Sequence, residues 1–260
     1  MSIFFRKFNN IKSKLIITFS VVLIIPALIT GILAYTSAKN AVEHEMLKGF
    51  SQTINILNSS INTLVQMKAH DINNYSNSIS ADLLQGDATI QLKEDFNHYV
   101  QLHPEAKSIY VSMDNGEFIQ APTITLPSNY DARKTDWYKE AMNKKGEVII
   151  SEPHVTADKE MVITISRTTS DHSGVVAIDI PLNYIQGLIN NVEIGEQGYA
   201  VLLDQHRKYI AHPTIEGGTE AKDSFYDEVY AKENGQIKYT FNGDEKIMAF
   251  ATNELTGWKL

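Results

Sequence analysis

The segment from Tyr130 to Tyr138, together with Asp179, carries the side chains best suited to chemistry in this 260-residue chain. An ammonium group that leaves water must be met by hydrogen-bond acceptors and a counter-charge, and Asp179 with the tyrosine hydroxyls supplies both. Trp137 adds an indole N–H and an aromatic face that suits a cation or an apolar side chain. These residue types favour a site for a small ammonium-bearing or zwitterionic ligand. They are equally compatible with core aromatics at Trp137 and Tyr138 and an Asp179 that caps a neighbouring loop.

The rest of the sequence contains no catalytic or cofactor signature, because GxxxxGK[ST], GxSxG and HExxH are all absent. Its eight histidines are scattered, and only the pairs His98/His103 and His206/His212 are close in sequence, at irregular loop spacing that is typical of solvated side chains. The chain has no cysteine, which excludes disulfides, a thiol nucleophile and cysteine-ligated metals. We therefore expect no enzyme, no cofactor and no metal site.

Charge is distributed very unevenly along the chain. All 31 acidic residues lie at or beyond Glu43, whereas Arg6, Lys7, Lys12 and Lys14 give the first fourteen residues a charge of +4. Residues 15–260 carry 19 basic against 31 acidic residues, a net charge of −12. A body this acidic repels phosphate backbones, so nucleic acid is not an expected partner.

An uncharged run of 24 residues, 15–38, follows the basic start. As a helix it spans roughly 36 Å, enough to cross a hydrocarbon layer of about 30 Å. The small residues Thr36 and Ala38 leave a cleaved secretory signal as the alternative, but the run exceeds the usual apolar core of ~7–15 residues. We predict a cytoplasmic basic tail at 1–14, an uncleaved transmembrane helix at 15–38, and export of everything from about residue 39.

The next segment, 39–86, predicts one long helix, because apolar residues recur every three or four positions on one face. That stripe suits packing on the chain's own domain or a seam with a parallel helix in a homodimer, and Lys68 interrupts it. Its members are Phe50, Ile54, Leu57, Ile61, Leu64, Ile72, Tyr75, Ile79 and Leu83.

Beyond the helix, short β-branched and aromatic runs alternate with turn residues. They predict strands at 108–113, 117–120, 146–151, 160–167 and 174–180, with a helix around 136–143, which together form an α+β unit with an antiparallel sheet. The unit is repeated: 110–122 resembles 200–213, 146–151 resembles 235–240, 160–166 resembles 245–251, and 173–178 resembles 256–260. The nearly constant offset, 90 falling to 83 residues, predicts two tandem sheet modules at 87–190 and 191–260, the second stopping within its last strand.

The basic start, single span and long helix, with YDARKTDWYKEA (130–141), GVVAIDIPL (174–182), GEQGYAVLLD (195–204) and IAHP (210–213), resemble the double Cache (dCache) extracellular sensor of bacterial methyl-accepting chemotaxis receptors. The resemblance covers essentially the whole chain. It implies two PAS-like modules, a ligand in the membrane-distal module 87–190, and a signal carried across the membrane by a small axial helix displacement within a dimer.

Amino-acid-binding members of that family carry Tyr, then Arg five residues on, then Trp-Tyr, a later Tyr, and Asp in the last strand of the distal module. Tyr130, Trp137, Tyr138 and Asp179 match this pattern. The resemblance therefore implies that the residues that hold an ammonium group are retained.

The same comparison shows two departures. Thr135 occupies the place of the Arg that would hold a carboxylate, and His154 stands close to where the later Tyr is expected. Arg133 shares a face with Thr135 if the segment is extended, and is then the alternative carboxylate partner. Without it, amines become as plausible as amino acids. In the second module, Asp204 and His212 match the family framework and are interpreted as structural.

We therefore expect a membrane-anchored extracytoplasmic sensor of small amines or amino acids that serves chemotaxis. The alternatives are the sensor half of a histidine kinase or of a cyclic-dinucleotide cyclase, which use the same module, and a passive extracellular binding or scaffold module. An exported hydrolase that uses acidic residues has the least support, because no motif indicates one.

Overall fold

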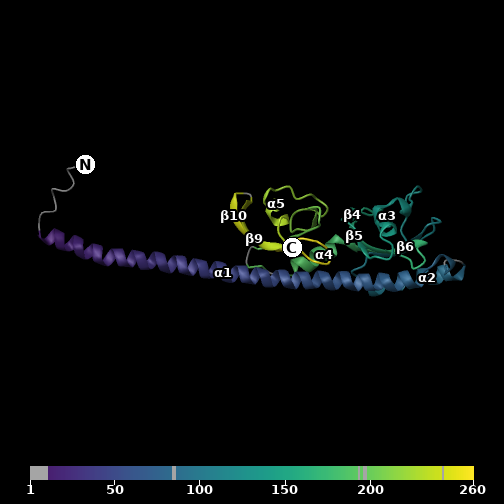
Figure 1. The fold of residues 1–260 in the computed structure, drawn as a ribbon, viewed down its shortest axis with the longest axis horizontal. Helices are drawn as coiled ribbons and strands as arrows, with labels where there is room; N and C mark the ends of the chain where they lie inside the picture. The colour runs from purple at the N-terminus through teal and green to yellow at the C-terminus, as the bar shows by residue number, and fades with distance from the viewer. Residues whose placement is uncertain (1–10, 84–85, 193, 196–197, 242) are drawn as a thin grey trace. The chain divides into compact units, whose positions relative to one another are not determined.

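The computed structural model describes residues 11–83, 86–192, 194–195, 198–241 and 243–260 (Figure 1). By its internal contacts the chain forms two compact units, Met1–Phe50 and Ser51–Leu260, which are described separately. Arg6 and Lys7 of the predicted basic tail lie outside the described residues, as do residues 196 and 197 of the GEQGYA motif.

The first unit contains the start of helix α1 (Ile11–Ser78), the one helix among the described residues that is long and apolar enough to cross a membrane. Its large apolar side chains between 15 and 35 are exposed, among them Phe19, Leu23 and Ile32. A continuous exposed apolar surface of this length is stable in hydrocarbon rather than in water. The anchor predicted at 15–38 lies within this segment.

In the second unit, α1 buries the predicted apolar stripe, including Leu57, Ile61 and Ile72, against the rest of the unit. The sequence predicts one helix up to residue 86, but α1 ends at Ser78 and a 3-10 turn, η2 (Ala81–Leu83), follows. The reason is a competing partner: the carbonyl of Ser76 accepts a hydrogen bond from the backbone N–H of Ser170 instead of continuing the helix. A second helix, α2 (Asp87–Leu102), which the periodicity analysis does not predict, then begins.

An antiparallel sheet follows and confirms the predicted α+β class. Its strands lie in the order β2-β1-β6-β5-β3, with the short β4 also paired to β5. The strands are β1 (Ser108–Met113), β2 (Phe118–Ala121), β3 (Ile149–Ile150), β4 (His154–Val155), β5 (Met161–Thr168) and β6 (Gly174–Pro181). The helical segments of this module are η3 (Ala132–Lys134), α3 (Asp136–Asn143) and α4 (Leu182–Asn190).

The two faces of the sheet enter different clusters of buried side chains, as alternation along a strand requires. Ile109 and Val111 of β1 join the core that also contains the buried face of α1. Tyr110, between them, points to the opposite face, where it meets Trp137 of α3. Strand β6 alternates in the same way, so Asp179 lies on the Tyr110 side of the sheet.

The second module contains β7 (Leu202–Leu203), β8 (Tyr209–Ala211), α5 (Phe225–Tyr230), β9 (Asn234–Phe241) and β10 (Asp244–Ala251). The repeat predicts a second, shorter copy of the sheet module here, and the described strands form two separate pairs, β7-β8 and β9-β10. Single bridges from Lys259 to Leu203 and to Thr252 connect the pairs. The two-residue length of β7 and the register shift within it explain why pairing does not extend further. Trp258, beside this bridge, is buried in the same core as α1.

Lys68, which interrupts the apolar stripe, is completely buried at 0% exposure. Its Nζ lies 2.6 Å from Glu105 Oε1 and 3.0 Å from Asp71 Oδ2, and it donates to the Tyr99 hydroxyl at 2.9 Å. A buried ammonium is stable only with partners of this kind. Lys68 therefore links α1 to α2 and to the loop that precedes β1.

We predict that Lys68→Met lowers the free energy of unfolding, measured by urea unfolding, by about 3 kcal/mol, because Asp71 and Glu105 lose their buried counter-charge.

Burial pushes the pKa of Glu105 upward, but the hydrogen bonds from Lys68 and His103 outweigh it and hold that pKa below 4.5. A lowered pKa contributes stability above about pH 4.5 that is lost as the pH falls through the folded-state value. Glu105→Gln should therefore lower the free energy of unfolding at pH 7 and leave it nearly unchanged at the acid end of a pH series of urea-unfolding measurements. A pH-independent cost would contradict this assignment.

Candidate ligand-binding site

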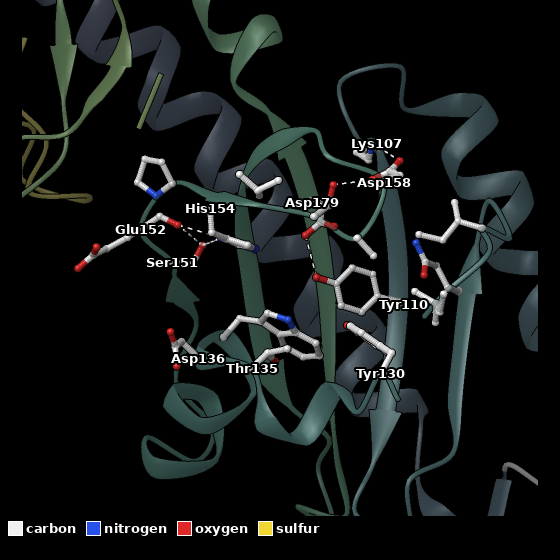
Figure 2. A pocket seen from close by; sticks show the side chains of 18 of the residues that line it. Lys107, Tyr110, Tyr130, Thr135, Asp136, Ser151, Glu152, His154, Asp158 and Asp179 are labelled. Carbon is white, nitrogen blue, oxygen red and sulfur yellow. Dashed lines mark hydrogen bonds and ion pairs between the residues drawn. The ribbon is translucent and has the colours of Figure 1, made fainter. Parts of the chain in front are cut away.

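A cavity of about 470 Å³ lies on the Tyr110 face of the sheet. Its floor is formed by side chains of β1, β2 and β6, and its walls by the segments 124–140 and 151–158 (Figure 2). The lining residues are Lys107, Tyr110, Phe118, Gln120, Ile124, Leu126, Tyr130, Thr135, Asp136, Trp137, Glu140, Ser151, Glu152, Pro153, His154, Val155, Thr156, Ala157, Asp158, Asp179 and Lys208.

Asp179 lies at the base of the cavity with 4% of its surface exposed. Its Oδ1 accepts hydrogen bonds from the Tyr110 hydroxyl at 2.7 Å and from Thr164 Oγ1 at 2.6 Å, and its Oδ2 accepts from Ser108 Oγ at 3.0 Å. Burial raises the pKa of Asp179 above its usual 3.8, although the three hydroxyls and, more weakly, the charge of His154 act in the opposite direction. All three are neutral donors, so none of them cancels the charge of an ionised carboxylate.

Sheet register explains how three hydroxyls converge on one carboxylate. Asp179 of β6 is directly opposite Ser108 of β1 on one side and Thr164 of β5 on the other. Tyr110 is two residues beyond Ser108, so it lies on the same face of the sheet.

Aromatic rings line the cavity beside Asp179. Trp137 packs edge-on against Tyr110, with ring centroids 5.1 Å apart, and Phe118 lies between Tyr110 and Tyr130, 5.6 Å from each. Figure 2 shows the side chain of Tyr130 beside that of Tyr110. Burial, with contributions from Asp179 and Asp131, raises the pKa of Tyr130 to about 12, so its hydroxyl stays protonated at neutral pH. The group offers aromatic faces and hydroxyl oxygens to a cation.

His154 closes the opposite side of the cavity in Figure 2. Its Nε2 lies 3.3 Å from Thr164 Oγ1, and its Nδ1 lies 3.0 Å from the carbonyl oxygen of Glu152. Through Thr164 the imidazole is connected to the carboxylate of Asp179. Both ring nitrogens of His154 thus contact protein oxygens, and the residue lines the cavity beside Thr164.

Five of the seven predicted site residues line the cavity: Tyr130, Thr135, Trp137, His154 and Asp179. Tyr138 is buried under Trp137, with ring centroids 5.7 Å apart, and is not among the lining residues. Arg133 also lies outside the lining. Ligand binding by these residues stays a prediction.

The position of Arg133 has a local cause. Arg133 would share a face with Thr135 only in an extended segment, but residues 132–134 form the 3-10 turn η3, and Asp131 caps that turn by accepting from the Arg133 backbone N–H. The guanidinium then pairs with both carboxylate oxygens of Asp131 and donates to the Asp114 carbonyl. Thr135, which faces the cavity, uses its hydroxyl to donate to the carbonyl of Ala132.

Two lysines in the lining are absent from the sequence-based set. Lys107 pairs with Asp158 at 2.6 Å and with Glu160, and Lys208, which comes from the second module, pairs with Glu152 at 2.6 Å. Each ammonium already has a carboxylate partner at the rim. The sequence-based set also lacks Tyr110. Its alternation with Ile109 and Val111 in the strand 108–113 puts it on the opposite face from them, and this pattern could have indicated that Tyr110 faces the cavity.

Comparisons with known proteins agree with this architecture. The Cache-domain family model (dCache_1) matches residues 35–260. The methyl-accepting chemotaxis protein McpA of Bacillus subtilis (strain 168) is 36% identical over 255 residues, which is 98% of this chain and 39% of that protein. TlpB of the same organism is 36% identical over 252 residues, covering 96% and 38% respectively. The chain thus spans about two fifths of the length of these relatives.

Solved chemoreceptor domains share the fold. The ligand-binding domain of Pseudomonas aeruginosa PAO1 PctB, in complex with L-Arg, matches with a TM-score of 0.67 and 22% identity, covering 82% of this chain and 85% of that one. The ligand-binding domain of Pseudomonas fluorescens CtaA, in complex with L-isoleucine, matches with a TM-score of 0.70 and 19% identity, covering 85% and 93%. These likenesses show a shared fold.

We predict that Tyr110→Phe lowers the free energy of unfolding by about 1.5 kcal/mol, because a buried carboxylate loses one of its hydroxyl donors. Tyr130→Phe is the matched control: its hydroxyl has no hydrogen-bond partner among the described residues, so the change should stay within about 0.5 kcal/mol. Urea unfolding of both variants in detergent micelles makes the comparison. Equal losses of unfolding free energy in the two variants would show that the Tyr110–Asp179 hydrogen bond does not stabilise the fold.

Proposed function

This chain belongs to the Cache-domain family, and from that premise we propose that it is the extracytoplasmic sensor region of a chemotaxis receptor. It binds a small ammonium-bearing ligand, an amino acid or an amine, in the cavity above Asp179. The observation that carries the proposal is one buried carboxylate that faces a cavity lined by aromatic rings and receives only neutral donors. An ammonium group is the ligand chemistry that supplies the missing positive charge.

The charged groups around the cavity determine whether a ligand carboxylate can also be bound. The carboxylate of an amino acid needs hydrogen-bond donors, and a forked guanidinium is the strongest such donor. Here the guanidinium of Arg133 is engaged by Asp131, and the lining ammonium groups of Lys107 and Lys208 are engaged by carboxylates. The site is therefore matched to an ammonium more strongly than to a carboxylate, and amines belong to the proposed ligand class beside amino acids.

The domain organisation is part of the proposal. Residues 1–14 form the cytoplasmic tail, 15–38 the transmembrane helix, 39–86 the stalk-like helical segment, 87–190 the membrane-distal module and 191–260 the membrane-proximal module. The apolar exposed surface of α1 supports the anchor, and the matches to methyl-accepting chemotaxis proteins support a role in transmembrane signalling. A homodimer through the long helix would transmit ligand binding as a relative displacement, provided that the ligand favours one of two arrangements.

A screen of amines, amino acids and short organic acids against the chain in detergent micelles tests the proposal directly. A ligand present at a hundredfold excess over its Kd stabilises the folded state by about 2.7 kcal/mol, which a thermal-unfolding assay detects readily. We expect stabilisation by ammonium-bearing compounds and none by organic acids without an amine. Stabilisation by organic acids alone would contradict the ligand class.

Asp179→Ala should abolish binding of such a ligand, with a loss of roughly 2–5 kcal/mol, because the counter-charge to the ammonium is removed. Asp158→Ala is the matched control, since this carboxylate also lines the cavity but pairs with Lys107 at the rim. Calorimetry of both variants, after circular dichroism has shown that they are folded, gives the result. Unchanged affinity in a folded Asp179 variant would make that residue purely structural.

The pH dependence of binding provides a separate expectation. Because burial raises the pKa of Asp179 above 3.8, part of the free protein carries a protonated carboxyl group just above that pH. An ammonium ligand pairs with the ionised form, so its affinity should rise with pH from about 4 and level off above the raised pKa. Titration calorimetry at several pH values measures this slope, and an affinity that falls over this range would contradict the ion pair.

Selectivity between amine and amino acid depends on position 135. In the wild type, an amine and its parent amino acid should bind within about tenfold of each other, or ~1.4 kcal/mol. Thr135→Arg should shift the preference toward the amino acid by supplying a forked donor. Arg133→Ala should leave the ratio unchanged, because its guanidinium is held by Asp131 outside the cavity lining. A large wild-type preference for the amino acid that Arg133→Ala erases would instead assign carboxylate binding to Arg133.

A further inference from the structure

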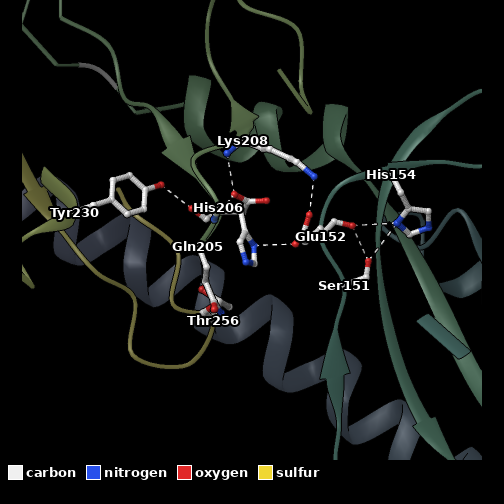
Figure 3. Close-up of polar contacts among 9 residues, drawn as sticks. Ser151, Glu152, His154, Gln205, His206, Lys208, Tyr230 and Thr256 are labelled. Atoms are coloured by element: carbon white, nitrogen blue, oxygen red, sulfur yellow. Dashed lines mark hydrogen bonds and ion pairs between the residues drawn. The ribbon is translucent and has the colours of Figure 1, made fainter. Parts of the chain in front are cut away.

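A second cluster of polar side chains lies where the two modules meet (Figure 3). Glu152 comes from the distal module, directly after β3, whereas Asp204 and His206 come from the turn between β7 and β8 of the proximal module. Each of the three offers one ligand atom, and these atoms lie within 4.8 Å of one another. Among the described residues, this is the one group of three such side chains that is close enough to share an ion.

Asp204 is the buried member of the cluster, with 3% of its surface exposed. Its Oδ1 accepts hydrogen bonds from the backbone N–H groups of His206 and Lys208, each at 2.8 Å. Its Oδ2 is buried as well, yet no donor among the described residues reaches it. Buried carboxylate oxygens are rarely left in this condition, because an unmet acceptor costs about 1–3 kcal/mol.

The neighbouring positive charges do not meet this oxygen. The ammonium of Lys208 donates to Glu152 Oε2 at 2.6 Å, and His206 Nδ1 lies 2.8 Å from Glu152 Oε1. Figure 3 shows both side chains directed at Glu152. Both cationic side chains are thus paired with Glu152, and Asp204 Oδ2 has no hydrogen-bond partner among the described residues.

We propose that Glu152, Asp204 and His206 bind a divalent transition-metal ion, with Zn²⁺ as the best match. Imidazole nitrogen and carboxylate oxygen are both zinc ligands, and water would complete a tetrahedron around an ion held by these three side chains. Ca²⁺ and Mg²⁺ prefer shells made of oxygen ligands alone. The sequence alone indicates a structural Asp204 and no metal site, so the proposed ion gives this residue a different role.

The geometry allows the site to close around an ion. Ligands at about 2.1 Å from zinc lie roughly 3.4 Å apart in a tetrahedron. Because the three ligand atoms lie within 4.8 Å of one another, no pair has to approach by more than about 1.4 Å. The side chains of Glu152 and His206 are 45% and 62% exposed, which leaves them room to move and gives a cation access from solvent. Asp204 is fixed by its two backbone hydrogen bonds and supplies the rigid ligand.

Such an ion would join the two modules at a point that also borders the cavity. Glu152 and its neighbours Ser151 and His154 are among the cavity-lining residues. Zinc would therefore tie the loop that closes the ligand cavity to the β7–β8 turn of the other module. This inference does not depend on the identity of the organic ligand.

Calorimetric titration of the untagged full chain in detergent micelles, freed of metal with EDTA and exchanged into metal-free buffer, tests the site with Zn²⁺ alone. We expect one Zn²⁺ per chain, and an affinity at least about tenfold lower in His206→Ala and in Asp204→Asn. His98→Ala is the matched control, because His98 is an exposed histidine on α2 and its loss should change nothing. Lys208→Met should strengthen binding, since it removes the ammonium that competes for Glu152.

No Zn²⁺ binding up to about 1 mM would overturn the proposal, as would unchanged affinity in His206→Ala or equal losses in His206→Ala and His98→Ala. Thermal unfolding with and without Zn²⁺ is the second measurement, and the ion should stabilise the wild type but not His206→Ala. Should Asp204→Asn fail to fold, His206→Ala decides the question, because the His206 side chain is exposed and its replacement leaves the core unchanged.

Discussion

The distal module is organised around a carboxylate placed in the middle of its sheet. Strand β6 is flanked on both sides, by β1 and β5, so Asp179 has no direct access to bulk water through a sheet edge. An acid in that position is stable only when its oxygens receive hydrogen bonds, and the neighbouring strands carry Ser108 and Thr164 at the two positions directly opposite it. The need of Asp179 for hydrogen-bond donors thus constrains one position in each of the two flanking strands. The cavity is the space above this group.

Much of the fold follows from patterns that are local in sequence. Helix α3 occupies the predicted residues 136–143, and β1, β5 and β6 lie within a residue or two of their predicted ranges, because apolar alternation and turn residues determine them. The predicted strand 146–151 shrinks to Ile149–Ile150, since only these two residues pair with β5. Helix α2 escaped notice because it is polar on most of its surface and buries only Phe96 and Tyr99 fully.

Only part of the site could be predicted, because some of its contacts join residues that are far apart in the sequence. Trp137 and Asp179 were identifiable as an aromatic and an acid in unusual settings, yet the hydroxyls that bind Asp179 come from positions 15 to 71 residues away. Such pairings depend on strand register, which a local pattern does not specify. Arg133 shows the opposite case, because a local hydrogen bond determines where its side chain lies. The carboxylate of Asp131, two residues away, holds the guanidinium that the sequence offered as an alternative partner for a ligand carboxylate.

The two modules are joined by contacts of different kinds. Buried apolar residues such as Leu182 and Ile210 belong to one continuous core, while the rim carries the ion pair between Glu152 and Lys208. Buried Asn253 adds a polar contact at the far end of the chain, donating to Asn58 and Asn62 of α1 at 2.8 Å each. The apolar contacts supply stability without direction, whereas the polar contacts fix which groups face each other.

The chain's two tryptophans lie in different modules, and this gives it an optical property of its own. Trp137 borders the cavity, and Trp258, 3% exposed, is buried in the core shared with α1. Indole emission responds to the polarity around the ring, so a molecule entering the cavity alters the spectrum of Trp137, while Trp258 reports on packing in the proximal module. Replacing either one by Phe isolates the signal of the other, so that events in the two modules are followed separately without an added dye.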